Sequence, residues 1–179
     1  MPHNSDKNRR SENKLPSVCA VVLNWNAYDD TTECIESLMK TEYDNFKIII
    51  VDNASTDGSD EKLAQVYPNI CMLNMNNNGG YAAGNNVGIL WGIENGFDYL
   101  LVINNDTIVE PDFLTRLIET IEADPAIGIV TGKVLYYDQK NRIYSAGGKY
   151  SKLFCTGING KFKQNEESLD HEEMIQEIS

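Results

Sequence analysis

Positive charge is scarce in this sequence. Its 15 Lys and Arg residues stand against 27 Asp and Glu residues, which gives a formal net charge of -12 at pH 7. Binding to the phosphate backbone of a nucleic acid requires a basic surface, so this composition argues against nucleic acid as a partner. A nucleotide is not excluded, because backbone amides and a metal ion can hold its phosphates without cationic side chains.

Long hydrophobic runs are also missing. No apolar stretch approaches the roughly 18 residues that a membrane-spanning helix needs, and the N-terminus lacks the apolar core of a signal peptide. We therefore expect a soluble, cytoplasmic protein. Residues 1–16 are polar and contain four Lys or Arg residues, so we expect them to form a disordered tail. Contact between this tail and the anionic inner face of a membrane stays open.

Several motifs of familiar enzyme classes are absent. The four Cys residues are widely spaced, without a Cys-x-x-Cys pair, and three lie within apolar segments, which favours structural thiols over zinc or disulfides. His3 and His171 lie in the two tails and no Gly-x-Ser-x-Gly occurs, which argues against a serine nucleophile. Residues 79–84 lack the glycine spacing of a dinucleotide site, and no Gly-Lys pair is followed by the Ser or Thr of a P-loop. Neither NAD chemistry nor ATP hydrolysis is therefore expected.

What the sequence does contain is a repeated alternation of short apolar runs and helical patterns. The apolar runs predict strands over residues 18–23, 46–51, 70–73 and 99–103. A helical pattern follows each strand; a capping box at Asp30 and Glu33 predicts the start of the first helix, and Pro111 predicts the start of the fourth. Strands that alternate with helices predict an α/β fold with a mostly parallel sheet and helices on both faces.

The pattern changes toward the C-terminal end. Shorter runs predict a further strand and then a small β annex around Gly turns, over residues 127–130, 134–137, 143–148 and 150–154. Residues 164–179 are acidic, and we expect a loop, a short helix or a disordered end there. One domain is expected over residues 17–163, and the chain reads as cut rather than finished because no closing element follows.

Polar side chains follow three of the four predicted strands, at residues 24–26, 52–57 and 104–106. Since the carboxyl ends of parallel strands meet at one edge of a sheet, we expect these clusters to form a site rather than three separate Asn-rich turns. An unpaired Asp52 would be costly in an apolar setting, and a nucleobase imide or a ribose hydroxyl would satisfy it. Asp106 follows two amides, so a Mg²⁺ or Mn²⁺ site shared with a diphosphate is expected there.

Four segments carry a resemblance to a known family. They are Val-Val-Leu-Asn-Trp-Asn at 21–26, Ile-Val-Asp-Asn-Ala-Ser-Thr-Asp-Gly-Ser at 50–59, Asn-Asn-Gly-Gly-Tyr-Ala-Ala-Gly-Asn-Asn-Val-Gly at 77–88 and Asn-Asn-Asp-Thr at 104–107. In this order they resemble family 2 glycosyltransferases, and within that family they are most similar to the rhamnosyltransferase-like branch. The resemblance covers residues 17 to about 133.

The resemblance implies a GT-A, Rossmann-like fold that binds a nucleoside diphosphate sugar. It places residues 24–26 and Asp52 at the nucleobase and ribose, residues 79–85 beside the diphosphate and sugar, and Asp106 on a divalent metal ion. The candidate nucleotide-sugar-binding residues are Asn24, Trp25, Asn26, Asp52, Asn53, Ser55, Asp57, Gly79, Gly80, Gly84, Asn85, Asn104, Asn105 and Asp106.

The resemblance also implies inverting transfer of a sugar from a dTDP- or UDP-linked donor, with rhamnose as a candidate, to a glycan or lipid-linked acceptor. In that mechanism a carboxylate base deprotonates the acceptor hydroxyl while the metal neutralises the departing diphosphate. Asn104 replaces the first carboxylate of the family's Asp-x-Asp motif, so metal binding rests mainly on Asp106. No equivalent of the family's base is found, because the acidic residues after Gln164 lack an apolar frame.

Two alternatives stay open on the sequence. A non-catalytic module that binds a sugar nucleotide would show the same donor motifs without a base. A phospho-accepting receiver domain also places an Asp at a strand end, as Asp52 is placed. That domain needs an acidic pair after its first strand, where this chain has Asn24, Trp25 and Asn26.

Overall fold

A computed structural model of the chain describes residues 15–139, 141–151 and 156–159. The chain divides between Leu114 and Thr115 into two compact units. The first unit contains the parallel sheet, and the second contains most of helix α4 and two small antiparallel sheets. The domain limits expected from the sequence, 17–163, stay a prediction.

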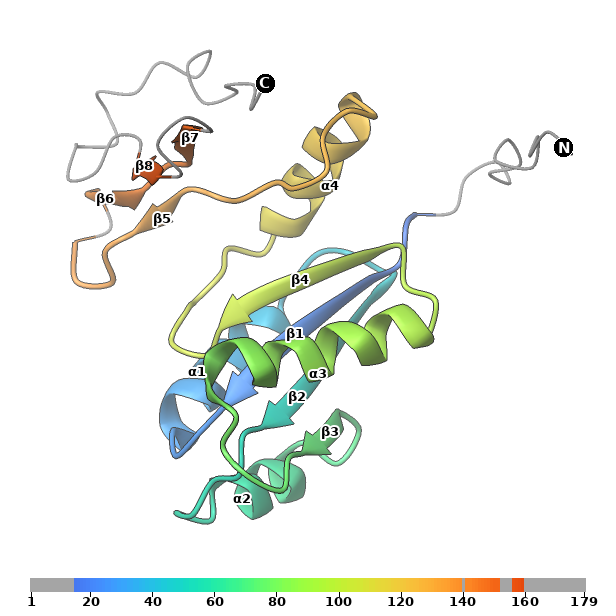
Figure 1. The fold of residues 1–179 in the computed structure, drawn as a ribbon, viewed down its shortest axis with the longest axis vertical. Coiled ribbons are helices and arrows are strands. Elements are labelled where there is room, and N and C mark those ends of the chain that lie inside the picture. Colours follow the sequence, from blue (N-terminus) through green and yellow to red (C-terminus); the bar gives the residue numbers. More distant parts are fainter. Residues whose placement is uncertain (1–14, 140, 152–155, 160–179) are drawn as a thin grey trace, which may run out of the picture. The chain divides into compact units, whose positions relative to one another are not determined.

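The first unit is built on a parallel sheet with the strand order β3-β2-β1-β4 (Figure 1). Its β-branched, apolar segments favour extended backbone, and the inner strand β1 and the second half of β2 are buried on both faces, as is usual in parallel sheets. Within the described residues the strands are β1 (Val18–Asn24), β2 (Phe46–Asp52), β3 (Cys71–Asn74) and β4 (Tyr99–Asn104). The parallel sheet predicted from the sequence is confirmed.

Each strand of this sheet is followed by a helix, as expected. The helices are α1 (Tyr28–Leu38), α2 (Ser59–Val66), α3 (Gly80–Glu94) and α4 (Phe113–Ala123). The predicted capping box is wrong, because α1 starts at Tyr28 and Asp30 lies in its first turn. The fourth helix starts at Phe113 rather than at Pro111, whose carbonyl accepts a hydrogen bond from the backbone N–H of Glu42 at 2.8 Å.

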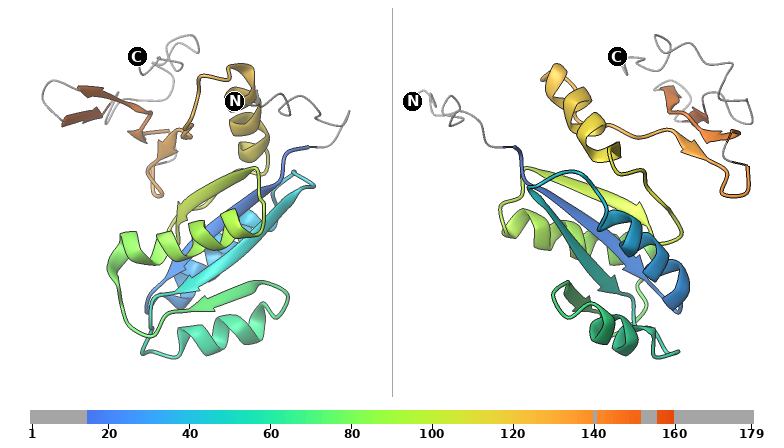
Figure 2. Two further views of the ribbon diagram at one scale, coloured as in Figure 1. Left: turned by 45° about the vertical axis from the view of Figure 1, so that its right-hand side comes forward. Right: turned by 180° about the vertical axis from the view of Figure 1, so that it is seen from behind.

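Helices α1, α2 and α3 cover both faces of the sheet, as the sequence predicted (Figure 2). Along β1, Ala20 and Val22 pack with α1 on one face, while Cys19 and Val21 pack against α3 on the other. Helix α2 lies on the same face as α1, because Leu63 packs with Ile35 of α1 and Ile50 of β2. The result is a three-layer α/β arrangement.

Helix α3 lies on the sheet through a row of glycines. Gly84, Gly88 and Gly92 are four residues apart and therefore share one face of the helix. A Cβ atom added to Gly88 would lie 2.3 Å from Cγ1 of Val21, and one added to Gly84 would lie 2.4 Å from Cδ1 of Leu23. The absence of side chains there is what allows the helix to approach the strands so closely.

Replacement of Gly88 with Ala is therefore expected to destabilise the chain by about 1 to 2 kcal/mol. Overpacking against Val21 and Val51 outweighs the roughly 1 kcal/mol that Ala gains over Gly in a helix. Urea unfolding followed by circular dichroism measures the change. Gly128 is the matched control, because an added Cβ there meets no atom within 4 Å. Equal stability of the two variants would contradict this packing argument.

The second unit contains the β annex that the sequence predicted. Strand β5 (Val134–Leu135) pairs with β6 (Ile143–Ser145), and β7 (Gly148–Ser151) pairs with β8 (Thr156–Asn159), both antiparallel. The strand expected at 127–130 is wrong, because no described strand pairs with it and Ile129 is 86% exposed. Part of the strand expected at 150–154 lies outside the described residues.

None of the helices in the described parts of the chain combines the length and the apolar character needed to cross a membrane.

Candidate functional site

The register of the sheet brings the polar strand ends together at one edge. Asn24, the last residue of β1, pairs with Asp52, the last residue of β2. On the other side of β1, Leu23 pairs with Asn104, the last residue of β4. The predicted clusters therefore lie side by side at the carboxyl ends of the strands, where ligands bind in open α/β sheets (Figure 1).

Asn24 is the centre of a buried hydrogen-bond network at this edge. It is fully buried, and its Nδ2, which carries two hydrogens, lies within hydrogen-bond distance of three oxygens: Oδ1 of Asp52 at 2.7 Å, Oγ of Ser59 at 2.9 Å and Oγ of Ser55 at 3.1 Å. Its Oδ1 accepts a hydrogen bond from Oγ1 of Thr31 at 2.9 Å. The Asn24 amide thus joins β1 to α1, to the start of α2 and to the loop after β2.

Asp52 has its partners within the protein. Its carboxylate accepts hydrogen bonds from Asn24, from Oγ of Ser55 at 2.6 Å and from the backbone N–H of Ser55 at 2.8 Å. Only 2% of its surface is exposed. The expectation that Asp52 lacks a partner and needs a ligand to satisfy it is therefore wrong, because the loop that follows β2 folds back onto the carboxylate. Direct contact of Asp52 with a nucleotide stays a prediction.

The two loops at this edge are locked to each other. Asn26 accepts a hydrogen bond from the Thr56 N–H at 2.7 Å, and its own N–H donates to Oγ of Ser55 at 3.0 Å. Asn26 and Ala54 both adopt positive φ, 52° and 58°, a conformation that side chains disfavour and that is concentrated at functional sites. The side chain of Trp25, the residue before Asn26, is 53% exposed.

Asp57 lies at the rim of this loop as an exposed carboxylate. Hydrogen bonds from the Ser59 hydroxyl and the Ser59 backbone N–H lower the pKa of the Asp57 carboxyl. The Ser59 N–H lies 3.0 Å from Oδ1 of Asp57. This group therefore stays ionised near neutral pH and is a weak base.

A second polar cluster surrounds the start of α3. Oδ1 of Asn53 accepts a hydrogen bond from the Gly79 N–H at 3.0 Å, and Oδ1 of Asn78 accepts one from the Gly80 N–H at 2.8 Å. Nδ2 of Asn53 donates to Oδ1 of Asn78 at 3.0 Å. The first amides of the helix thus bond to side chains. The glycine loop is tied to the end of β2, and a diphosphate beside Gly79 and Gly80 stays a prediction.

Two further predicted residues lie deeper in α3. Gly84 faces Leu23 of β1, so packing against the sheet explains why it carries no side chain. Asn85 is 4% exposed and its Nδ2 donates to the Tyr81 carbonyl at 3.0 Å. Its Oδ1 is buried without a hydrogen-bond partner among the described residues.

The three polar residues at the end of β4 differ in their hydrogen bonds and exposure. Asn104 accepts a hydrogen bond at Oδ1 from the Tyr81 hydroxyl at 2.8 Å. Nδ2 of Asn105 donates to Oγ1 of Thr31 at 2.9 Å, so Asn105 joins the network around Asn24. Asp106 is exposed, and nothing in the described parts of the chain bonds its carboxylate.

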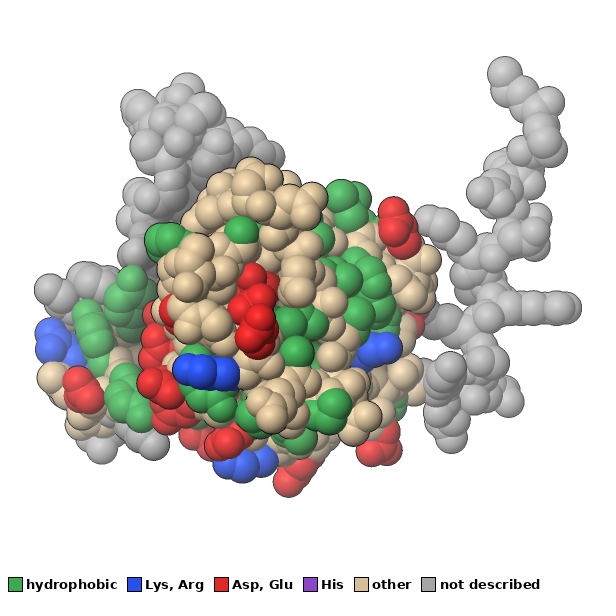
Figure 3. Space-filling model, turned by 90° about the horizontal axis from the view of Figure 1, so that it is seen from below, with side chains coloured by type: hydrophobic (Ala, Val, Ile, Leu, Met, Phe, Trp, Pro, Cys, Tyr) green, Lys and Arg blue, Asp and Glu red, His purple; other side chains and the backbone are tan. Residues whose placement is uncertain are grey.

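The Asp106 carboxylate fits one position of a divalent-metal site. It is a hard oxygen donor, it is accessible, and a neutral amide precedes it. Residues 15–139, 141–151 and 156–159 contain no group of three or more His, Cys, Asp or Glu side chains that would hold a metal without a ligand. Seen from the side of α2 and β3, Lys and Arg side chains lie singly rather than in a patch (Figure 3). A diphosphate here would need a metal ion and backbone amides to balance its charge.

Three cysteines of the parallel sheet and its helices carry free thiols, and one of them, Cys34, contacts the site. Cys19, Cys34 and Cys71 form no disulfide. Burial raises the pKa of the Cys34 thiol to about 12 and that of Cys19 to about 11. Both therefore stay protonated at neutral pH, and Cys34 donates to the Asn104 carbonyl with Sγ at 3.6 Å from the oxygen.

Sequence reasoning missed three side chains of this site, Thr31, Ser59 and Asn78, and included Tyr81 only as part of the segment 79–85, without a role of its own. Ser59, Asn78 and Tyr81 lie inside the segments on which the family resemblance rests, so proximity to the predicted residues was an available signal. Thr31 lies seven residues after Asn24 in the first turns of α1, and no local pattern marks it.

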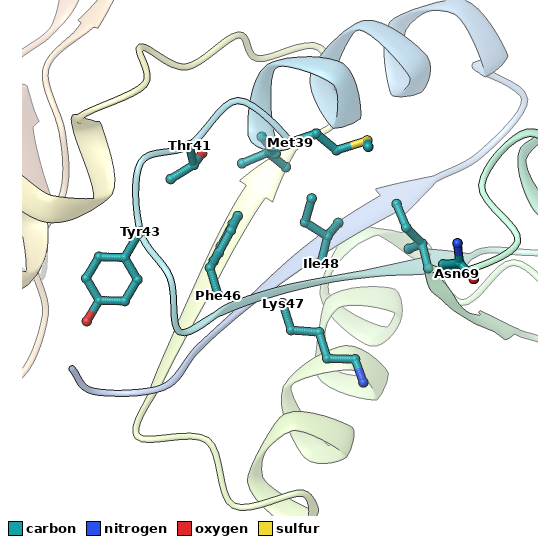
Figure 4. A pocket seen from close by; sticks show the side chains of 9 residues that line it. Met39, Thr41, Tyr43, Phe46, Lys47, Ile48 and Asn69 are labelled. Carbon is teal, nitrogen blue, oxygen red and sulfur yellow. The ribbon is translucent and has the colours of Figure 1, made fainter. Parts of the chain in front are cut away.

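A hollow of about 320 Å³ lies elsewhere, at the opposite end of β2. Phe46, where β2 begins, is roughly 20 Å along the strand from Asp52 at 3.3 Å per residue. Met39, Phe46 and Ile48 line the hollow, and the Lys47 side chain points away from these residues, toward α3 (Figure 4). Its Nζ lies 5.4 Å from the centre of the Trp91 ring. No charged side chain is thus directed into the hollow by this strand, and we do not assign the nucleotide to it.

Comparison with known proteins decides the family. The family model described as "Glycosyl transferase family 2" matches residues 19–175. This chain belongs to glycosyl transferase family 2. The resemblance inferred from the four sequence motifs is confirmed, whereas the rhamnosyltransferase-like branch stays a prediction.

Similar family 2 proteins are found among curated sequences. Glycosyltransferase GlyG of Streptococcus pneumoniae serotype 4 is 30% identical over 131 residues, which cover 72% of this chain and 42% of GlyG. The poly-beta-1,6-N-acetyl-D-glucosamine synthase of Staphylococcus aureus strain MSSA476 is 26% identical over 121 residues, covering 66% of this chain and 29% of the synthase. The chain thus spans less than half the length of these relatives.

Solved structures confirm the GT-A type of α/β fold. The mannosyltransferase PcManGT of Pyrobaculum calidifontis, solved with GDP-Man and Mn²⁺, superposes on this chain with a TM-score of 0.58 at 21% sequence identity. The superposed region is 68% of this chain and 36% of the PcManGT chain. S. aureus TarS 1–349, solved with UDP, superposes with a TM-score of 0.53 at 17% sequence identity. The superposed region is 69% of this chain and 43% of the TarS chain. At sequence identities of 21% and 17%, the structural likeness establishes the fold alone.

Proposed function

We propose that this chain is the donor-binding portion of a glycosyltransferase and holds a nucleoside diphosphate sugar at the carboxyl edge of its sheet. The observation that carries the proposal is the register of β1, β2 and β4. It places a buried scaffold and a set of exposed polar groups at one edge of a family 2 fold. The whole enzyme would transfer the sugar to a glycan or lipid-linked acceptor in the cytoplasm, at the inner face of the membrane.

The site divides its residues between two tasks. Asn24, Asp52 and Asn53 are at most 3% exposed, so they hold the loops in place. Trp25, Asn104 and Asp106 are exposed at the same edge and are the groups that reach a ligand. The Trp25 ring would stack on the base, and the amide and the carboxylate would face ribose and diphosphate.

The donor we propose is a UDP- or dTDP-sugar, with rhamnose among the sugars to test. TarS has been solved with UDP and with UDP-GlcNAc, and PcManGT with GDP-Man and Mn²⁺. The family therefore supports a divalent metal as cofactor, and Mg²⁺ and Mn²⁺ are both candidates. Asp106 would hold it, and the ion would neutralise charge on the departing diphosphate.

The reaction we propose is an inverting displacement at the anomeric carbon, which needs a base to deprotonate the acceptor hydroxyl. The carboxylates at the strand ends do not suit this task. Asp52 is buried among its own hydrogen bonds, the pKa of Asp57 is lowered, and Asp106 is the candidate metal ligand. The base is therefore proposed to come from outside the donor site.

The experiment that tests the proposal is a thermal-shift panel of UDP-, dTDP- and GDP-sugars, each with and without Mn²⁺. A ligand that binds only the folded chain raises its melting temperature. We expect the uridine or thymidine series to raise it, and more so with Mn²⁺. No shift with any sugar nucleotide would contradict donor binding. If a sugar nucleotide does bind, an assay of sugar transfer by a longer natural chain distinguishes an enzyme, which transfers the sugar, from a module that only binds the donor.

Replacement of Asp106 with Ala is expected to abolish the Mn²⁺-dependent part of this shift. The melting temperature of the free chain should change little, because the Asp106 carboxylate is exposed and unbonded in the described structure. Asp44, an exposed carboxylate in the loop before β2, provides the matched control when replaced with Ala. If the free Asp106→Ala chain unfolds instead, the residue is structural and not a metal ligand.

A further inference from the structure

A hydrogen bond in the site connects helix α3 with the end of strand β4, although neither the sequence motifs nor the pairing of the strands requires this contact. The hydroxyl of Tyr81, in the first turn of α3, donates to Oδ1 of Asn104, the last residue of β4, at 2.8 Å. Tyr81 is 59% exposed and Asn104 is exposed as well, so neither side chain is placed there by burial. The hydrogen bond between them is what defines their relative orientation.

The backbone of Asn104 is fixed independently of this contact. Asn104 pairs with Leu23 in the sheet, and its carbonyl accepts hydrogen bonds from the Thr107 N–H at 3.2 Å and from the thiol of Cys34 at 3.6 Å. The freedom that remains to Asn104 is the rotation of its side-chain amide. Tyr81 removes that freedom by engaging the amide oxygen.

The bonded oxygen decides which chemistry the amide offers. An Asn side chain has one acceptor oxygen and an NH₂ group with two donors, on opposite edges of a plane. With Oδ1 engaged by the Tyr81 hydroxyl, the NH₂ group on the other edge of the amide donates no hydrogen bond within the described residues, and the side chain is exposed. The amide therefore presents donors at a position where the family's motif has a carboxylate.

We propose that Tyr81 is a positioning residue that makes Asn104 a hydrogen-bond donor to an oxygen of the nucleotide, rather than a ligand of the metal. The inference rests on the proposed function, since it concerns the same nucleotide site. The acceptor oxygen belongs to the ribose or to the diphosphate, and both offer lone pairs to an amide N–H. The site then holds part of its ligand without metal.

Calorimetric titration with UDP in the presence of EDTA tests this role. Tyr81→Phe is expected to weaken UDP binding about 3- to 10-fold, the effect of one hydrogen bond. The loss should be absent in an Asn104→Ala background, because the two residues act in series. Tyr67→Phe, which removes a hydroxyl at the far end of α2, is the matched control. A full loss from Tyr81→Phe in the Asn104→Ala chain would overturn the proposal, since Tyr81 would then touch UDP itself.

Two further experiments identify which nucleotide oxygen accepts the hydrogen bond from Asn104 and test how a negative charge at position 104 changes binding. If uridine binding falls as UDP binding does, the amide bonds the ribose; if uridine binding is unchanged, it bonds the diphosphate. Asn104→Asp is expected to bind Mn²⁺ more tightly without nucleotide, because it adds a second carboxylate near Asp106. It should also weaken UDP binding in EDTA through repulsion of the diphosphate. Unchanged UDP affinity of Tyr81→Phe and of Asn104→Asp would overturn the proposal.

A ligand-free measurement separates failure of this inference from failure of the proposed function. In ¹⁵N-labelled chain, the side-chain NH₂ resonances of Asn104 are identified by their loss in Asn104→Ala. Tyr81→Phe should move them while the melting temperature stays within about 1 °C of the unmodified chain, because both side chains are exposed. If those resonances do not move, Tyr81 does not orient the amide. If they move but UDP does not bind, the donor site fails and the positioning contact stands.

Discussion

Replacement of Asp52 with Ala is expected to lower the melting temperature of the chain by roughly 6 to 12 °C and to weaken UDP binding at least about tenfold. The substitution removes the acceptor of three hydrogen bonds, from Asn24, the Ser55 hydroxyl and the Ser55 N–H. Hydrogen bonds to a charged group contribute about 1.5 to 3 kcal/mol each, so a total loss of about 3 kcal/mol is a modest expectation. In a chain of this size each kcal/mol lowers the melting temperature by about 2 to 4 °C.

Binding should fall in the same variant because the loop after β2 loses its anchor. Ala54 is held at a positive φ of 58° in that loop, and the loop positions Asn26 and Trp25 through Ser55 and Thr56. Differential scanning calorimetry and isothermal titration measure the two effects on one sample. Asp44→Ala, which removes an exposed carboxylate, should change neither. If Asp52→Ala keeps its melting temperature and loses only UDP binding, the residue contacts the nucleotide directly, as the sequence alone suggested.

The second large effect concerns catalysis. This chain is expected to bind a sugar nucleotide but to transfer sugar about 10² to 10⁴ times more slowly than a chain that carries the general base. The strand-end carboxylates are already engaged: Asp52 is bonded within the protein, and hydrogen bonds from Ser59 lower the pKa of Asp57. Binding should survive, because the proposed contacts to base, ribose, diphosphate and metal all lie in the first unit.

Incubation with radiolabelled UDP-sugars and dTDP-rhamnose, with lipid-linked and free glycan acceptors, measures the transfer. A longer natural chain assayed in parallel provides the positive control for donor and acceptor. Efficient turnover by the 179-residue chain would refute this expectation. It would also direct the search for the base to the acidic residues after Gln164, which lie outside the described residues.

Most of the architecture could be predicted from the sequence because it depends on periodicity. Apolar runs of strand length end where polar residues begin, and a parallel sheet then places those ends on one edge whatever the details of packing. Asn24, Asp52 and Asn104 are brought together for this reason alone. The same reasoning failed at 127–130, because an apolar run forms a strand only where another strand pairs with it.

The internal chemistry of the site could not be predicted, because it depends on loop conformation. The sequence placed Asp52 at a strand end but gave no sign that the chain would turn back within three residues and bond its carboxylate through Ser55. The contact between Tyr81 and Asn104 spans 23 residues and two elements. Neither residue pattern nor spacing encodes such a contact; it follows from how closely Gly84 and Gly88 let α3 approach the sheet.

The measurement that tests the central claim most directly is a two-dimensional NMR titration of ¹⁵N-labelled chain with UDP and Mn²⁺, compared with UDP and EDTA. If the carboxyl edge is the nucleotide site, the largest amide shifts fall on residues 24–26, 53–57, 79–81 and 104–106. Those at 104–106 should depend on the metal. Amides beside the hollow at Met39, Phe46 and Ile48 should stay unchanged. Shifts concentrated at that hollow, with the strand ends unaffected, would contradict the account.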